Sequence, residues 1–309
     1  MTEPTPVILS LHAMATRFEL MLHGDDPIRL RAAGEEALAE IERLDVQLSL
    51  YRSESEVTWI NSRAGRGPIR VEPRLFRLLQ RCVDIAARTD GAFDITIAPL
   101  IRAWGFAGGP GKVPQPEELE AARRIVGMRH VRLDAEYFTV RFDQPGIELD
   151  LGAVGKGYAI ERAANLLREN GATSAFLHGG TSSACAIGTP PNQAAWRVAI
   201  RRPTEEDNPL DIVSLQDNSL SVSAVHGKLF SDGIKEYGHI IDPRTGMPVE
   251  DVLAAAVIGP SSTDCDALST ALLVLGEPGL HMLAEGFPGY SGIVAVRVPD
   301  GTVQAVKSA

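Results

Sequence analysis

The feature that most constrains the fold is an irregular succession of helical and strand-like hydrophobic periodicity along the chain. A proline in the first turn, followed by apolar residues at helical spacing, predicts amphipathic helices over residues 27–47, 73–88 and 116–126. Apolar and β-branched runs predict strands over residues 18–22, 137–142, 175–178, 196–200, 254–258 and 293–298. Loops are expected over the Gly- and Pro-rich residues 107–114 and over residues 203–209. Because there is no regular βαβ alternation, the pattern predicts an α+β fold of mixed helices and strands.

Size, composition and charge set broad limits on the class of protein. With 309 residues, of which 44% are apolar, the chain can bury one large core or two smaller ones. We therefore expect a single domain over residues 1–309, either undivided or built of two lobes without a clear linker. The formal net charge of −10 argues against a nucleic-acid partner, because displacing counterions from phosphates requires a basic surface. No apolar run is long enough to span a bilayer.

The cysteines and the first residues bear on the compartment. Cys82, Cys185 and Cys265 lie far apart, without the spacing of a metal site. Three is an odd number, which argues against a disulfide framework and fits a reducing compartment. The start, Met-Thr-Glu-Pro-Thr-Pro, has no leader pattern and no lipobox cysteine. We expect a cytoplasmic protein, or an exported one if a leader has been removed.

Residues 238–248, Gly-His-Ile-Ile-Asp-Pro-Arg-Thr-Gly-Met-Pro, predict a short strand that ends abruptly. Pro243 fixes its own φ and lacks an amide donor, and the glycine and proline that follow continue the turn. His239 and Asp242 are therefore expected at a strand end held by a rigid turn, where reacting groups are often mounted. The competing interpretation is an ordinary β-turn with a surface histidine.

Residues 150–160, Asp-Leu-Gly-Ala-Val-Gly-Lys-Gly-Tyr-Ala-Ile, lead from an apolar run into a helical pattern over residues 158–168. Three glycines leave nearly bare backbone that a polyphosphate could approach, and the helix would direct its positive end to the same place. Lys156 would add a point charge for phosphate. The spacing matches neither a Walker loop nor a dinucleotide fingerprint, so a plain tight connection is the alternative.

Residues 263–276 predict a helix with Thr263 or Asp264 at its N-cap and Gly276 at its C-cap. Asp266 and Thr270 are four residues apart and so share one face of that helix. A carboxylate and a hydroxyl one turn apart supply hard oxygen ligands of the kind that Mg²⁺ takes, together with water, phosphate and carbonyl oxygens. Simple helix capping by Asp and Ser or Thr is the competing interpretation.

Taken in this order, the three segments resemble the ApbE family of FAD:protein FMN transferases. The resemblance extends over nearly the whole chain, through residues 14–16, 48–51, 90–96 and 104–106. It implies an ApbE-like α+β fold with the flavin site between two lobes. It also implies Mg²⁺-dependent transfer of the FMN half of FAD to a Thr or Ser hydroxyl of an acceptor flavoprotein of a redox chain, with release of AMP. Such an acceptor carries an Asp-Gly-x-Ser/Thr-Gly-Ala-Ser/Thr segment.

The resemblance assigns roles to individual residues. It implies metal ligation by the backbone carbonyl of Ala153 and by Asp266 and Thr270, with Ser269 as a weaker candidate. The flavin-nucleotide contacts that it implies are Met14, Tyr51, Ala92, Phe93, Asp94, Asp150, Lys156 and the backbone near Ile240. For Tyr51 and Phe93, core packing is an alternative that is compatible with stacking on a flavin or adenine ring. We take His239 as the candidate general base, because the pKa of an unperturbed imidazole lies near the working pH, with Asp242 as the alternative base.

Several positions depart from the family pattern. Ala15 stands for a glycine, Thr181 for Asp or Asn, and Glu161 for Asp, and residues 223–227 stand for Thr-Ser-Gly-x-Tyr. The resemblance places these changes around the substrate pocket, where they bear on flavin orientation or acceptor choice and leave the metal and phosphate elements intact. Two alternatives to transfer therefore stay open. One is hydrolysis of FAD to FMN and AMP, and the other is non-catalytic FAD binding.

Overall fold

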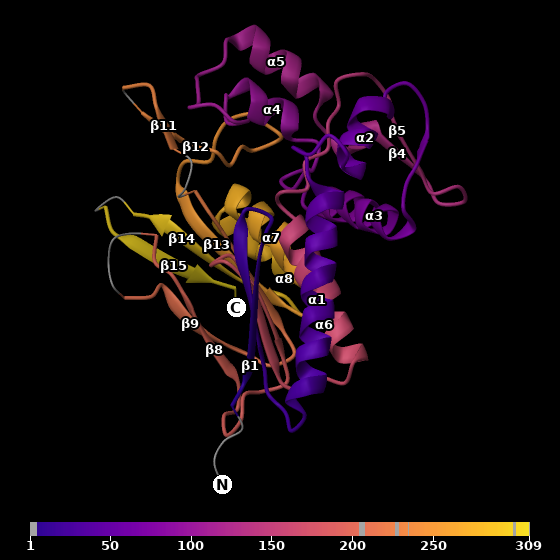
Figure 1. Cartoon of the computed structure of the whole chain (residues 1–309). Helices are drawn as coiled ribbons and strands as arrows, with labels where there is room; N and C mark the ends of the chain where they lie inside the picture. The colour runs from indigo at the N-terminus through magenta and orange to yellow at the C-terminus, as the bar shows by residue number, and fades with distance from the viewer. Residues whose placement is uncertain (1–4, 204–207, 226–228, 234, 299–300, 309) are drawn as a thin grey trace.

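A computed structural model describes residues 5–203, 208–225, 229–233, 235–298 and 301–308. Its centre is an antiparallel sheet of eight strands (Figure 1). In spatial order the strands are β1 (Val7–Ala13), β2 (Thr16–Leu22), β6 (Ala175–Gly179), β7 (Ser183–Ile187), β10 (Ser219–Ala224), β13 (Val252–Gly259), β14 (Ser291–Arg297) and β15 (Val303–Lys307). Strands from the two ends of the chain thus share one sheet.

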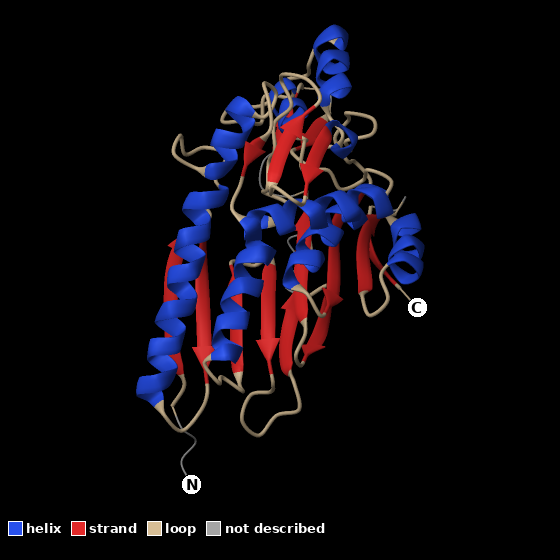
Figure 2. Ribbon diagram, turned by 90° about the vertical axis from the view of Figure 1, so that its right-hand side faces the viewer, coloured by secondary structure: helices blue, strands red, loops and turns tan. Residues whose placement is uncertain are grey.

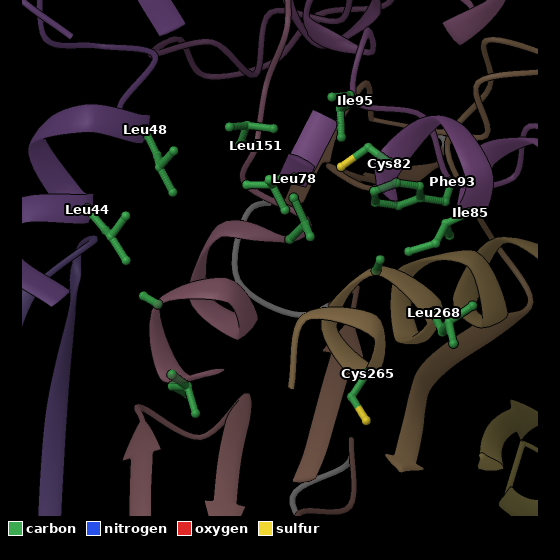
Figure 3. Packing of buried hydrophobic residues seen from close by; sticks show 14 of the residues in the cluster. Leu44, Leu48, Leu78, Cys82, Ile85, Phe93, Ile95, Leu151, Cys265 and Leu268 are labelled. Carbon is green, nitrogen blue, oxygen red and sulfur yellow. The ribbon is translucent and has the colours of Figure 1, made fainter. Parts of the chain in front are cut away.

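One face of this sheet is covered by helices, as Figure 2 shows. They are α1 (Pro27–Leu48), α6 (Gly155–Glu169), α7 (Ser262–Leu275) and α8 (Glu277–Gly286). The α1 helix begins where the Asp26 carboxylate accepts the amides of Ile28 and Arg29. Figure 3 shows buried side chains of α1, among them Leu44 and Leu48, in one core with Cys265 and Leu268 of α7.

The opposite face of the sheet carries a two-stranded ribbon of β8 (Trp196–Ile200) and β9 (Asp211–Leu215). Ile200 and Leu215 of this ribbon are buried in a smaller cluster with Ala186 and Leu220 of the sheet. The middle strands are therefore covered on both faces, which explains why every residue of β7 is buried.

The remaining elements lie beyond one end of the large sheet (Figure 1). They are α2 (Glu56–Arg63), α3 (Pro73–Arg88), α4 (Ala98–Ala103), α5 (Pro116–Ile125), the 3₁₀ helix η1 (Met128–His130), a small sheet of β3 (Ile69–Arg70), β4 (Val131–Asp134) and β5 (Thr139–Phe142), and a hairpin of β11 (Leu229–Ser231) and β12 (Glu236–Gly238). Phe230 and Tyr237 of the hairpin pack against a separate apolar cluster that contains Trp104. The hairpin is thereby fixed to α4 and α5.

The predicted α+β fold class is confirmed. Helix α3 has the predicted bounds, and α1 and α5 differ from prediction by one residue at their ends. Residues 107–114 form neither helix nor strand, as predicted, whereas residues 204–207 of the second predicted loop lie outside the described part. The structure adds many short elements that the periodicity did not reveal, including β11 and β12.

Several predicted boundaries are wrong: β2, β13 and β14 each begin two residues before the predicted start, and three other differences have a clear local cause. Helix α6 begins at Gly155, three residues before the predicted start. The N-cap of α7 is Ser261, whose hydroxyl accepts the Asp264 amide, so Thr263 and Asp264 lie inside the helix. Strand β5 begins at Thr139, because Phe138 has a φ of 51° and belongs to the preceding turn.

Ala15, which stands where the family pattern has a glycine, lies in the turn between β1 and β2. Met14 and Ala15 have φ angles of 49° and 57°, in the left-handed region that favours glycine. Alanine in that region costs roughly 1–2 kcal/mol. The Met14 amide donates to Asp45 Oδ1 at 2.9 Å, which ties this turn to α1.

Two further sequence observations have structural counterparts. Cys82, Cys185 and Cys265 are all buried, and none forms a disulfide. Among the described residues, no helix has both the length and the apolar character needed to cross a membrane.

Candidate active site

A cavity of about 870 Å³ lies where the glycine-rich turn, the end of β10, α7 and the segment after β12 meet. Most of the residues predicted for the site line it: Ala92, Phe93, Asp94, Asp150, Ala153, Lys156, His239, Ile240, Asp266 and Thr270. These residues come from distant parts of the sequence, and the fold brings them to one volume of the size that binds cofactors.

Four predicted site residues do not line the cavity. Met14 lies in the β1–β2 turn and packs against the main core. Ser269 is fully buried, and its hydroxyl donates to the Asp266 carbonyl at 2.9 Å. Tyr51 is 77% exposed, and partial burial and the charge of Asp150 raise the pKa of its hydroxyl. Asp242 is the fourth and belongs to the turn described below.

Asp266 is a buried carboxylate on the first half of α7. Its Oδ2 accepts the Gly157 amide at 2.8 Å, and its Oδ1 accepts the Ser221 hydroxyl at 3.1 Å. No Lys, Arg or His side chain within the described ranges forms an ion pair with it. A buried charge is costly unless a counter-charge reaches it, so this carboxylate is suited to a cation that enters the cavity.

The glycine-rich turn borders the cavity through Gly152 and Ala153, and its glycine amides bond within the protein. The amides of its three glycines are already used: Gly152 donates to Asp150 Oδ1, Gly155 to the Leu151 carbonyl and Gly157 to Asp266 Oδ2. A Cβ at Gly157 would lie 2.2 Å from the Ser262 carbonyl oxygen, so this glycine allows α6 to approach α7. The turn is therefore a helix-docking connection as well as a wall of the cavity.

Lys156 and Asp150 are the charged side chains of this turn that line the cavity. The side chain of Lys156 makes no hydrogen bond or ion pair with another residue in the portion of the chain that is described. Burial raises the pKa of Asp150, while the Gly152 amide and the Lys156 charge oppose that rise. Lys156 thus presents an unpaired ammonium group to the cavity, and the sequence prediction of a phosphate-binding charge stands as a prediction.

The segment before this turn is held from α2. The Asn61 side chain accepts the Leu149 amide at 2.8 Å and donates to the Leu149 carbonyl at 3.0 Å. A side-chain amide that pairs with both backbone groups of one residue takes the place of a neighbouring strand. Asp150 therefore enters the cavity wall from a fixed backbone.

Asp94 and Phe93 border the cavity, but Asp94 also bonds to neighbouring residues and Phe93 also packs in the main core. Asp94 Oδ1 accepts the Thr96 amide and hydroxyl at 2.7 and 2.6 Å, and its Oδ2 accepts the Met128 amide at 2.9 Å. Burial raises the pKa of Asp94 despite these bonds. Phe93 is 1% exposed and lies beside Cys82 and Ile85 in the main core (Figure 3). For Phe93, the packing interpretation therefore describes most of the side chain.

His239 is the first residue after β12, and it lines the cavity in a half-buried position. The backbone then folds into the predicted turn, in which the Asp242 amide donates to the Met247 carbonyl at 2.8 Å. Asp242 itself is turned to Arg244, whose Nε and Nη2 donate to it at 2.9 and 2.8 Å. The structure thus brings His239, and not the Asp242 carboxylate, to the cavity.

The N-terminus of α7 is anchored by an ionic network behind the cavity. Arg81 of α3 donates to Asp264 at 2.5 Å and to Glu161 of α6 at 3.0 Å. Glu161 also accepts the Ser261 hydroxyl and the Thr263 amide. Burial raises the pKa of Glu161, but Arg81 and these donors outweigh it, and the net pKa is lowered. The departure from Asp to Glu at position 161 therefore supplies an anchor for the helix that bears Asp266.

Sequence reasoning missed several residues of the cavity wall. Arg201 and Arg202 line it just after the end of β8, and Ser182 and Val222 also border it. No motif pointed to the arginines. Thr181 and Ser223 entered only as departures from the family pattern, and both line the cavity. His226 and Gly227, part of the same departure, lie outside the described residues.

The donor set at the cavity determines which metals it could hold. Across the described residues, no group of three or more His, Cys, Asp and Glu side chains is placed to hold a metal ion. The predicted set of Asp266, Thr270 and the Ala153 carbonyl is instead one carboxylate with two neutral oxygens, and all three residues line the same cavity. Such all-oxygen sets suit Mg²⁺ and Ca²⁺ far better than zinc or copper.

Comparison with known proteins gives one consistent match. The model of the ApbE family covers residues 14–294. An FAD:protein FMN transferase of Treponema pallidum is 33% identical over 291 residues, which is 89% of this chain and 80% of that protein. One of Salmonella typhimurium is 29% identical over 282 residues, or 88% and 79% of the two chains.

Solved structures agree with this match. The ApbE protein of Thermotoga maritima superimposes with a TM-score of 0.86 at 26% identity and covers 97% of this chain and 96% of its own. The apo flavinyl transferase ApbE of Pseudomonas stutzeri has the same TM-score at 29% identity, with coverages of 98% and 95%. The flavin transferase ApbE of Vibrio cholerae has a TM-score of 0.84 at 27% identity, with coverages of 99% and 97%.

Proposed function

This chain belongs to the ApbE family, and from that premise we propose that it transfers the FMN moiety of FAD to a Thr or Ser hydroxyl of an acceptor protein and releases AMP. The observation that carries the proposal is the composition of one cavity. A lysine and a buried carboxylate that form no ion pair within the described part of the chain line it together with a histidine. Transfer of FMN from a diphosphate to a hydroxyl is favoured by a cationic group at the phosphates, a ligand for the metal ion and a group that accepts the proton of the hydroxyl.

A Mg²⁺ ion fits the oxygen donors of this cavity. Asp266 would supply the charged ligand, Thr270 a hydroxyl and Ala153 a backbone carbonyl. The fit rests on the buried Asp266 carboxylate, because two of its hydrogen-bond donors, Gly157 and Ser221, are neutral. When bound, Mg²⁺ would neutralise the diphosphate of FAD and polarise the bond that breaks.

The protein's own groups would perform the remaining work. Lys156 would hold a phosphate oxygen by a charge-assisted hydrogen bond. His239 would accept the proton of the attacking hydroxyl, because it faces the cavity and its imidazole can gain a proton near neutral pH. The cavity walls would keep FAD and the hydroxyl in line and limit the access of water, which favours transfer over hydrolysis.

The test is incubation of the purified chain with FAD and Mg²⁺, with and without an acceptor domain that carries the Asp-Gly-x-Ser/Thr-Gly-Ala-Ser/Thr segment. AMP release and acceptor mass are followed together. Transfer predicts AMP release coupled to a gain of one FMN on the acceptor. AMP release without a mass gain would establish the hydrolytic alternative, and tight FAD binding without AMP would establish the non-catalytic one. An acceptor whose target Thr or Ser is replaced by Ala serves as the control.

A further inference from the structure

Strand β10 presents three serines, Ser219, Ser221 and Ser223, to the polar side of α7. They alternate with apolar residues, so all three project from the same face of the strand. Ser219 Oγ lies 2.7 Å from Ser262 Oγ, and Ser221 Oγ lies 3.1 Å from Asp266 Oδ1. We call these three serines and their partners on α7 the serine ladder.

The third serine of the ladder, Ser223, contacts Thr270, which is also predicted to be a metal ligand. Ser223 Oγ lies 3.1 Å from Thr270 Oγ1 and 2.8 Å from Ser269 Oγ. Two residues of a strand advance about 6.6 Å, and four residues of a helix advance about 6 Å. Because these two repeats nearly match, each serine of β10 meets the next turn of α7.

The two pairs of the serine ladder nearest the start of α7, Ser219–Ser262 and Ser221–Asp266, are almost fully buried. Ser219, Ser221, Ser262 and Asp266 are each at most 4% exposed. Buried hydroxyls must bond to protein groups, because an unpaired one costs roughly 1–3 kcal/mol. The hydroxyls on the ladder are therefore fixed in direction by their partners.

Each hydroxyl has only one proton to donate, and this determines the direction of the bonds. Ser221 lies near Asp266 Oδ1, near the Ser182 carbonyl at 3.2 Å and near Ser183 Oγ at 2.9 Å. A hydrogen bond to a carboxylate is about twice as strong as one to a neutral acceptor. Ser221 therefore donates to Asp266, and Ser183 is free to donate to Ser221.

The Asp266 carboxylate is consequently held from both oxygens. Gly157 donates to Oδ2 at 2.8 Å, and Ser221 donates to Oδ1. Lone pairs remain on the carboxylate, and Asp266 lines the cavity. Groups that orient a metal ligand in this way usually set the affinity for the metal as well as the ligand's geometry.

We propose that Ser221 and Ser223 are positioning residues for the metal ligands Asp266 and Thr270, whereas Ser219 only holds β10 against α7. The inference rests on the proposed function, because it assumes that the cation binds at Asp266. Replacing Ser221 should therefore affect metal binding, whereas replacing Ser219, a serine on the same strand, should not. Ser219 thereby becomes a matched control for Ser221.

The test compares Ser221→Ala with Ser219→Ala in otherwise intact FAD-loaded protein without acceptor. Free Mn²⁺ is measured by electron paramagnetic resonance during titration, with Mn²⁺ as the probe for the Mg²⁺ site. We expect Ser221→Ala to weaken Mn²⁺ binding about 10- to 100-fold and Ser219→Ala to leave it within about twofold. Both variants should lower the melting temperature of the metal-free protein, because each removes buried hydrogen bonds, and Ser221→Ala should lower it more because Ser221 Oγ has more partners.

Equal Mn²⁺ affinities for Ser221→Ala and wild type, or equal weakening in both alanine variants, would overturn the inference. If Ser221→Ala does not fold, Ser221→Cys replaces it, since a thiol has similar volume but is a weak donor; wild-type Mn²⁺ affinity in that variant would also overturn the inference. Asp266→Ala tests whether the cation binds at Asp266 at all, independently of the role of Ser221. If that variant binds Mn²⁺ like wild type, the proposed metal site itself is wrong.

Discussion

The two sides of the cavity are built in different ways. Asp266 lies on a long helix, is 4% exposed and is held by donors from α6 and β10. His239 follows a three-residue strand, is half-buried and belongs to a turn whose bonds are mostly local. Two long-range bonds fix that turn from outside: Trp104 Nε1 donates to the Gly246 carbonyl at 2.8 Å, and Arg123 Nη2 donates to the Arg244 carbonyl at 3.1 Å.

The difference matches the tasks proposed for the two residues. A metal ligand must keep its geometry through every cycle, so it benefits from burial and several fixed donors. A general base must meet the hydroxyl of a second protein and return its proton to water, so it benefits from a place near the surface. The comparison therefore predicts that changes on the α7 side act through metal binding, whereas changes on the turn side act through proton transfer.

The largest effect is expected from Asp266→Asn. The amide keeps an oxygen that can accept the Gly157 amide but loses the negative charge, so we expect transfer to fall by more than about 10³-fold while the fold is kept. Thr270→Ala should be milder, because it removes a neutral ligand. AMP formation at varied Mg²⁺ and thermal melting are the measurements. Wild-type Mg²⁺ dependence in Asp266→Asn would show that the metal ligand lies elsewhere.

The next effect is expected from His239→Asn. Loss of a general base should lower the transfer rate about 10²- to 10⁴-fold with FAD affinity nearly unchanged, and it should remove an ionisation near the histidine range from the acid limb of the pH–rate profile. The measurement is the rate from pH 5 to 9 together with FAD titration.

Asp242→Asn is the matched control for His239→Asn, because Asp242 belongs to the same turn but bonds to Arg244. It should keep a nearly normal rate, since a partly exposed ion pair is worth at most about 1 kcal/mol. A normal rate for His239→Asn beside an inactive but folded Asp242→Asn would move the base to the carboxylate. A parallel loss of rate and affinity in His239→Asn would instead indicate a flavin-positioning role.

The smallest effect is expected from Lys156→Ala, which belongs to the rigid side but contacts no other charged group closely in the described chain. Its removal should weaken FAD binding by roughly 1–3 kcal/mol, the scale of a charge-assisted hydrogen bond. Calorimetric titration with FAD and with riboflavin measures this loss. Riboflavin lacks phosphate, so an equal loss for both ligands would show that Lys156 does not contact phosphate.

The sequence predicted the helices better than their ends. The pair Asp26-Pro27 marks the start of α1 clearly, because Asp26 can cap the helix and Pro27 favours its first turn. At α7, residues 261–264 read Ser-Ser-Thr-Asp, and each of these side chains can cap a helix. The choice of Ser261 depends on Arg81, far away in sequence, which bonds to both Ser261 and Asp264.

For the site residues too, the sequence did not reveal contacts between distant segments. Local patterns brought His239, Asp266 and Lys156 into consideration, and the fold places all three at one cavity. The sequence could not show that the Gly157 amide is used by Asp266, a residue 109 positions away. The pairing of Asp242 with Arg244, by contrast, is local and could have been anticipated from their spacing. Contacts between distant segments are thus the part that pattern reasoning misses.

The strand order has a consequence for biosynthesis. In the large sheet, β10 lies between β7 and β13, and α7 follows β13 near the end of the chain. A ribosome that has joined only the first 250 residues has synthesised the glycine-rich turn and His239 but not Asp266. At that stage the central strands lack a neighbour and their helical cover, and such exposed edges are what chaperones shield. The site can therefore be completed only after the segment that bears Asp266 has been synthesised.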